Sequence, residues 1–187
     1  MLSALVNLVC AVCAVAAVWR HTKKAPLKIL LRYFTALSNL LCALAALAVV
    51  VCRLGGGEIP YVVGVFKYVA TAAVSVTLLT VVCFLGPTLG YKLMFTGPDL
   101  WLHLICPLLA VVSLLLWDAP DMPFGAVFLG TLPVALYGAV YIRRVRFAPE
   151  ERRWPDYYGF NRGGRWLLSF LIMLAAAFLI SLGLLLL

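Results

Sequence analysis

The chain has 187 residues, of which 65% are hydrophobic and 12% are charged, and its mean hydropathy is +1.09. A soluble fold of this size keeps too much of its surface in water to hide so many apolar side chains. These values exclude a soluble globular protein and predict an integral membrane protein, with lipid around most of the chain.

Hydropathy divides the chain into six apolar segments, each long enough to cross a bilayer as a helix. Turns containing Gly and Pro and an Arg-rich stretch separate them. The segments cover residues 2–19, 27–52, 62–85, 100–117, 123–142 and 166–187. We therefore expect one domain over residues 1–187, an all-α bundle of six transmembrane helices.

Basic residues are distributed unevenly between the loops. The connections after the first, third and fifth segments hold twelve Lys and Arg residues, whereas the connections on the other side hold only Arg53. The positive-inside rule then predicts that both termini lie outside and that the basic loops are cytoplasmic. The net charge of +8 is interpreted as this topology signal and as contact with anionic lipid headgroups, so no nucleic-acid partner is expected.

The second segment contains the block RYFTALSNLL, residues 32–41, in which four polar side chains lie among apolar ones. Polar groups at membrane depth are unfavourable and therefore informative. Arg32, near the interface, can extend to the headgroups, but Thr35 and Asn39 on the same helix face cannot. The alternative for Thr35, Ser38 and Asn39 is structural, because such side chains often bond a carbonyl one turn back or join two helices.

The fourth segment offers His103 in its first turn, within DLWLHLICPLL. By the rise per residue, Thr35 lies roughly 12 Å inside its segment and His103 roughly 5 Å inside its own, and both segments enter from the same side. Helix tilt covers that difference, so we expect the two side chains to meet in the cytoplasmic half. His103 is the expected proton carrier near neutral pH, while the other histidine, His21, is placed in a basic loop.

Two further segments contribute polar residues. Lys67 shares a face of the third segment with Thr71 and Ser75, and the fifth segment carries Tyr137 and Tyr141 one turn apart. These side chains could line a polar pocket inside the bundle. The alternatives are a lysine that extends to the outer headgroups and tyrosines that pack at the interface.

The block RYFTALSNLL, followed two segments later by LHLICPLLAVVSLLLWD, resembles the androgen-induced / androgen-dependent TFPI-regulating family of membrane proteins and its bacterial relatives. LPVALYGAVYI is similar to the fifth helix of those relatives, and the resemblance covers residues 28–142. Characterised members are threonine hydrolases that cleave fatty acid esters of hydroxy fatty acids. The resemblance implies that Thr35 is the nucleophile, that His103 is the second essential residue, and that the protein lies in a bacterial cytoplasmic membrane.

The residues leave three functions open. A lipid-ester hydrolase requires Thr35 and His103 close together in a lipid-accessible pocket, with Arg32 on a fatty-acid carboxylate. Ser38, Asn39, Tyr137 or a lysine such as Lys67 are the candidate donors to an oxyanion. A transporter or lipid-binding protein would have a polar path past Lys67, and a scaffold would have Thr35 bonded to its own backbone. No metal or cofactor is expected, and membrane lipids are the expected partners.

Overall fold

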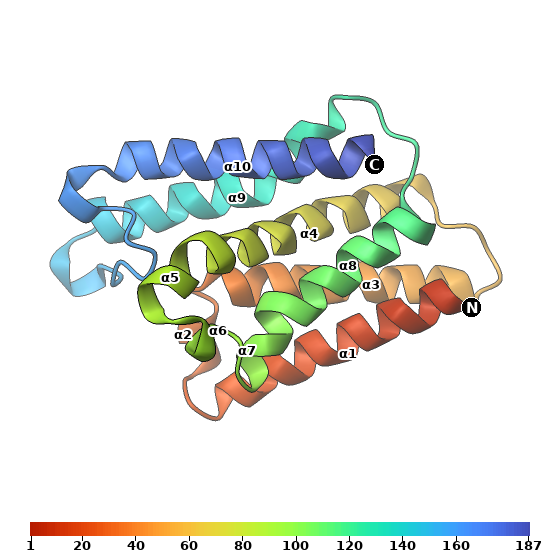
Figure 1. Ribbon diagram of the computed structural model, residues 1–187, viewed down its shortest axis with the longest axis horizontal. Coiled ribbons are helices and arrows are strands. Elements are labelled where there is room, and N and C mark those ends of the chain that lie inside the picture. The colour runs from red at the N-terminus through yellow and green to blue at the C-terminus, as the bar shows by residue number, and fades with distance from the viewer.

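The computed structural model describes all of residues 1–187 as helices and connecting loops, without strands (Figure 1). Six of its helices are long and apolar enough to cross a membrane. They are Leu2–Thr22, Phe34–Leu54, Tyr61–Leu89, Pro98–Asp118, Ala126–Phe147 and Trp166–Leu186. The predicted all-α, six-helix class is confirmed, and the chain is a multi-pass membrane protein.

The long helices run along one bundle, and a set of short ones lies at one end of it (Figure 1). The long elements are α1 (Leu2–Thr22), α3 (Phe34–Leu54), α4 (Tyr61–Thr80), α8 (Cys106–Ser113), α9 (Ala126–Ile142) and α10 (Trp166–Leu186). The short ones are α2 (Leu27–Leu30), α5 (Gly86–Leu89), α6 (Tyr91–Met94), α7 (Pro98–Leu100), η5 (Glu150–Arg152) and η6 (Arg162–Gly164). The two termini lie at one end, the termini end, and α2, α5, α6 and α7 gather with the 148–165 loop at the other, the short-helix end (Figure 1).

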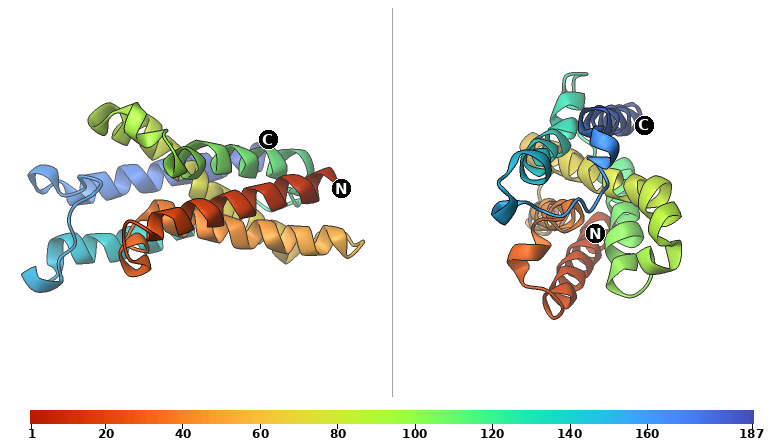
Figure 2. Two further views of the ribbon diagram at one scale, coloured as in Figure 1. Left: turned by 90° about the horizontal axis from the view of Figure 1, so that it is seen from below. Right: turned by 90° about the vertical axis from the view of Figure 1, so that its left-hand side faces the viewer.

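Small side chains form the centre of the bundle. Helices α1, α3, α4 and α8 meet through alanines and cysteines, and the helix pair α9 and α10 packs on the other side of α4 (Figure 2). The central cluster consists of Cys10, Ala11, Ala14, Cys42, Ala43, Ala45, Ala46, Ala70, Val74, Cys106 and Ala110. Small residues let helix backbones approach closely, which is how helices associate in lipid.

Near the short-helix end, two helices contain a π-helical stretch before a proline. The π-helical stretch η1 (Val81–Leu85) precedes Pro87, and η2 (Trp101–Ile105) precedes Pro107. A proline ring clashes with the carbonyl four residues back, and a local π turn relieves that clash. Two more π-helical stretches, η3 (Leu114–Asp118) and η4 (Arg143–Phe147), end α8 and α9. The α5 end of the third span turns away from the bundle axis (Figure 2).

The segment expected as one helix over 27–52 is two helices. Helix α2 ends at Leu30 and α3 begins at Phe34, and two distant tyrosines satisfy the backbone at the break. Tyr137 donates its hydroxyl proton to the Arg32 carbonyl at 2.8 Å, and the Phe34 N–H donates to the Tyr158 hydroxyl at 3.0 Å. Thr35 therefore lies in the first turn of α3 and not roughly 12 Å inside a continuous helix.

The contact between α9 and α10 depends on Gly130. A Cβ atom there would lie 2.5 Å from the Ser181 Oγ and 3.1 Å from the Tyr68 ring. We expect Gly130→Val to lower the free energy of unfolding by about 1–3 kcal/mol, because overpacking forces the helices apart. Reversible unfolding in mixed detergent micelles measures the change. Gly183→Val on α10 is the control, since a Cβ there meets nothing within 4 Å, and an equal loss in both variants would contradict the packing argument.

Candidate functional site

A cavity of about 370 Å³ lies at the short-helix end, between α1, the start of α3, η1, η2 and the 148–165 loop. Most of its lining is apolar, but seven side chains in it carry hydroxyl, imidazole or carboxylate groups. They are His21, Tyr33, Thr35, Asp99, His103, Tyr157 and Tyr158. Thr35 and His103, the two residues singled out from the sequence, thus line the same cavity.

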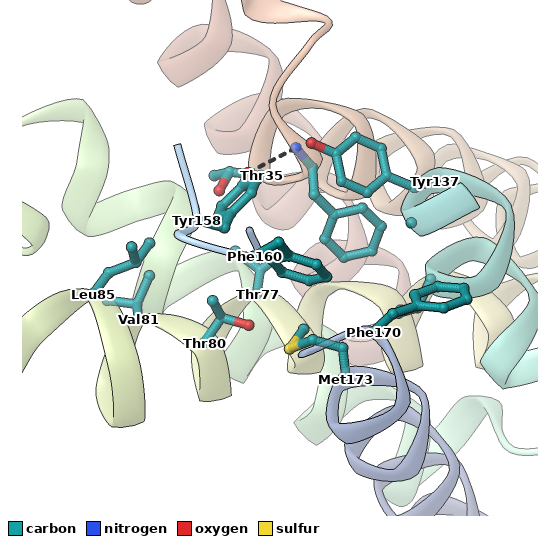
Figure 3. A pocket seen from close by; sticks show the side chains of 13 residues that line it. Thr35, Thr77, Thr80, Val81, Leu85, Tyr137, Tyr158, Phe160, Phe170 and Met173 are labelled. Carbon is teal, nitrogen blue, oxygen red and sulfur yellow. Dashed lines mark hydrogen bonds between the residues drawn. The ribbon is translucent and has the colours of Figure 1, made fainter. Parts of the chain in front are cut away.

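A second, narrower cavity of about 30 Å³ lies on another side of Thr35 (Figure 3). Its wall is mostly apolar and comes from α3, α4, α9, α10 and the 148–165 loop. Thr35, Leu85 and Tyr158 line both cavities. Thr35 therefore separates a large cavity with several polar groups from a small, mostly apolar cavity.

The hydroxyl group of Thr35 is not bound to its own helix. Thr80 and Thr131 donate their hydroxyl protons to the carbonyl four residues back, at 2.8 and 2.9 Å, as threonines in membrane helices commonly do. Thr35 is the second residue of α3, so it has no carbonyl one turn back in its own helix, and the polar side chain beside its hydroxyl is that of Tyr158. The N–H groups of Thr35 and Ala36 make no backbone hydrogen bond either, as is usual in a first turn.

His103 presents one ring nitrogen as an acceptor. Its side chain is 6% exposed, and its Nδ1 lies 2.9 Å from the carbonyl oxygen of Met94, at the end of α6. A carbonyl only accepts, so this contact assigns the proton to Nδ1 and leaves Nε2 unprotonated in the neutral ring. The Nε2 atom makes no hydrogen bond in the protein, which is the state that a general base requires.

His21 and Asp99 line this cavity as well, which the sequence analysis did not predict. His21 lies in the last turn of α1 and not in a loop, and its Nε2 is 3.3 Å from the Asp99 Oδ1 on α7. Both side chains are partly exposed, at 21% and 32%, so the pair lies toward the rim. The only available signal was that Asp99 is the single acidic residue between the third and fourth segments.

The 148–165 loop folds back against α3 and α9. Asp156 organises it, because its carboxylate accepts the Tyr141 hydroxyl at 3.1 Å and the backbone N–H groups of Phe160 and Asn161 at 2.9 and 2.8 Å. The Tyr141 oxygen in turn accepts the N–H of Tyr158 at 3.2 Å. Burial raises the pKa of the Tyr158 hydroxyl above its usual range, which keeps it protonated. Tyr157 and Tyr158 of this loop line the large cavity, and Tyr158 and Phe160 line the small one.

Ser38 and Asn39 hold the helices that carry the site. The Ser38 Oγ lies 2.9 Å from the Thr77 Oγ1, a bond between α3 and α4. The Asn39 Nδ2 donates to the carbonyls of Thr35 at 2.9 Å and Leu102 at 3.0 Å. Asn39 thereby ties α3 to η2, the elements that carry Thr35 and His103.

Arg32 and Lys67 lie outside the two cavities. The Arg32 guanidinium lies 5.6 Å from the centre of the Trp154 ring, at the short-helix end. Lys67 is fully buried toward the termini end, where its Nζ donates to the Asn7 Oδ1 at 2.6 Å. The structure thus brings Thr35, His103 and Tyr137 to the cavities and places Lys67 in a separate network.

The fold and the cavity together define a multi-pass membrane protein with an internal cavity that Thr35 and His103 line. No protein-family model, no curated protein and no solved structure matches the chain. The chain also holds no group of three His, Cys, Asp or Glu side chains placed to bind a metal ion.

Proposed function

We propose that the protein is an intramembrane hydrolase of lipid-like carboxylic esters, with Thr35 as nucleophile and His103 as general base. The observation that supports this proposal is that a Thr35 hydroxyl not bound to its own helix and a His103 Nε2 without a proton line one cavity. The sequence resemblance adds the substrate class, fatty acid esters of hydroxy fatty acids. The apolar lining of the cavity suits acyl chains that already partition into a bilayer.

In the first half of the reaction, the Thr35 Oγ1 attacks the ester carbonyl carbon. A threonine hydroxyl is a weak nucleophile until a base removes its proton, and the His103 Nε2 accepts that proton. The tetrahedral intermediate collapses with loss of the alkoxide, which takes the proton from His103, and leaves an acyl-Thr35. Thr35 and His103 are not directly hydrogen-bonded, so the proton passes after a rotation of Thr35 or through one water molecule.

In the second half, a water molecule replaces the alcohol. His103 accepts a proton from the water as its oxygen attacks the acyl carbon, and returns that proton to the Thr35 Oγ1 as the C–O bond breaks. The His21–Asp99 pair near the rim lies between this chemistry and the basic loops. We infer from the positive-inside rule that this end faces the cytoplasm, from which water and the released carboxylate exchange.

Labelling with a lipophilic fluorophosphonate tests the nucleophile. We expect the wild type to be labelled at Thr35, located by mass spectrometry, and Thr35→Ala to remain unlabelled. Thr80→Ala is the matched control, because Thr80 lines the small cavity but donates its hydroxyl to the Val76 carbonyl. It should label like the wild type. A folded wild type that stays unlabelled, or a Thr35→Ala variant that labels equally, would exclude the assignment.

A transporter is the alternative function, and the arrangement of polar groups favours it less. The Lys67 network at the termini end and the cavity at the short-helix end are separated by the central cluster of alanines and cysteines. A cavity at one end of the bundle suits an enzyme, whereas transport requires access from both faces. Uptake of a fatty acid into proteoliposomes without ester cleavage would support the transporter instead.

A further inference from the structure

The proposed hydrolysis needs a hydrogen-bond donor that the residues singled out from the sequence do not supply. When Thr35 attacks, the former carbonyl oxygen becomes an oxyanion, and donors preorganised near it lower the barrier. The Asn39 amide donates to the Thr35 and Leu102 carbonyls, and Tyr137 donates to the Arg32 carbonyl. Ser38 bonds to Thr77 and to the Thr35 carbonyl. These side chains already have acceptors.

Lys67 is no closer to supplying the donor. Its ammonium is bound to Asn7, and it lines neither cavity. The oxyanion donor must therefore be a group beside Thr35 whose proton is not bound to a backbone carbonyl.

Tyr158 meets that requirement. Its side chain lies next to Thr35 and lines both cavities (Figure 3). Its oxygen accepts the Phe34 N–H at 3.0 Å, and the side-chain hydroxyls beside it are those of Thr35, the nucleophile, and Tyr137, which donates to the Arg32 carbonyl. A hydroxyl that already accepts a hydrogen bond is polarised and becomes a better donor. The N–H groups of Thr35 and Ala36 lie at the same helix start, where the helix dipole favours negative charge.

We propose that Tyr158 donates a hydrogen bond to the oxyanion that forms when Thr35 attacks an ester. The 148–165 loop thereby supplies a catalytic residue to a site whose nucleophile and base come from α3 and η2. The inference rests on the proposed hydrolase function. In the step itself, a bond forms between Thr35 Oγ1 and the carbonyl carbon, the Thr35 proton moves to His103, and the carbonyl π electrons become the lone pair that Tyr158 stabilises.

The first measurement compares Tyr158→Phe with Tyr91→Phe in ester hydrolysis. Tyr91 is the control, since its hydroxyl donates to the Val82 carbonyl at 2.8 Å and its side chain lines neither cavity. We expect kcat of Tyr158→Phe to fall about 10²- to 10³-fold with KM changed less than about 3-fold, as for other lost oxyanion donors. Tyr91→Phe should keep kcat within about 3-fold. Equal kcat in wild type and Tyr158→Phe would overturn the proposal.

A second measurement separates catalysis from support of the helix start. The Thr35 Oγ1 adds to the carbonyl carbon of a trifluoromethyl ketone, and the ketone oxygen becomes an oxyanion. The matching methyl ketone binds without this addition and therefore without the charge. We expect Tyr158→Phe to weaken the trifluoromethyl ketone by the same factor as kcat/KM and to leave the methyl ketone unchanged. Replacing Tyr158 by 4-aminophenylalanine, which retains a donor, should restore part of the activity. Equal weakening of both ketones would show that Tyr158 only holds the start of α3 and would overturn the proposal.

The outcomes also separate this inference from the proposed function. If the folded wild type neither hydrolyses esters nor reacts with a fluorophosphonate, the hydrolase proposal and the role of Tyr158 fail together. If the wild type hydrolyses esters and labels at Thr35 while Tyr158→Phe retains full kcat, only the Tyr158 assignment fails.

Discussion

Asp118→Ala is expected to lower the free energy of unfolding by about 3–5 kcal/mol, the range for removing one partner of a buried charge network. The Asp118 side chain is fully buried and accepts the Ser3 hydroxyl at 2.6 Å and the Asn7 amide at 2.7 Å. Arg53 lies 3.7 Å from the same carboxylate, and Asn7 also binds the buried Lys67. Without Asp118, the Lys67 charge has no nearby counter-charge in an apolar surrounding.

Reversible unfolding in mixed micelles measures this loss. Asp121→Ala is the control, because Asp121 belongs to the same connection but is exposed. It should change stability by less than about 0.5 kcal/mol, as surface substitutions usually do. The double variant Asp118→Leu and Lys67→Met should be more stable than Asp118→Leu alone, since it removes the unpaired charge together with its partner. Equal losses in Asp118→Ala and Asp121→Ala would contradict the network.

His103→Ala is expected to reduce ester hydrolysis about 10²- to 10⁴-fold, the range for a lost general base. The reason is geometric, because the Met94 carbonyl fixes the proton on Nδ1 and leaves Nε2 as the acceptor inside the cavity. Steady-state hydrolysis of a long-chain ester in detergent or nanodiscs measures the change.

The other histidine in the cavity supplies the control for this prediction. His21 pairs with Asp99 near the rim, and His21→Ala should reduce turnover less than about 10-fold. Added imidazole should recover part of the activity of His103→Ala, because a small base can enter the space of the missing ring. A His103→Ala variant that retains its thermal midpoint and its full turnover would exclude His103 as the base.

Hydropathy predicted the six helices because burial of backbone groups in lipid leaves no other structure for long apolar segments. It could not predict the break at residues 31–33. No glycine or proline marks that break, and its free backbone groups are satisfied by Tyr137 and Tyr158, more than 100 residues away in the chain. Such a break depends on tertiary contacts, and periodicity within the segment carries no information about them.

The part of the candidate site that depends on how deep Thr35 and His103 lie in their helices was predictable from the sequence. The segments that carry Thr35 and His103 enter from the same side, from which the sequence analysis predicted that the two side chains meet; they line one cavity without a hydrogen bond between them. The proton position on His103 depends on Met94, and the reach of Tyr158 depends on the folding of a long loop. Neither follows from spacing in the sequence. His21 was missed because α1 continues to Thr22, three residues beyond the expected segment 2–19.

The π turn before Pro107 makes the site depend on residue count as well as residue type. A π turn holds about one residue more than an α turn, and each extra residue rotates the preceding side chains by about 100° around the helix axis. Within η2, that rotation directs His103 to the cavity, while Cys106 and Ala110 on α8 face the central cluster. Loss of a single residue such as Leu104 would turn the imidazole away without changing any group in the site. Insertions and deletions in this stretch can therefore abolish the chemistry of a chain that keeps every polar residue.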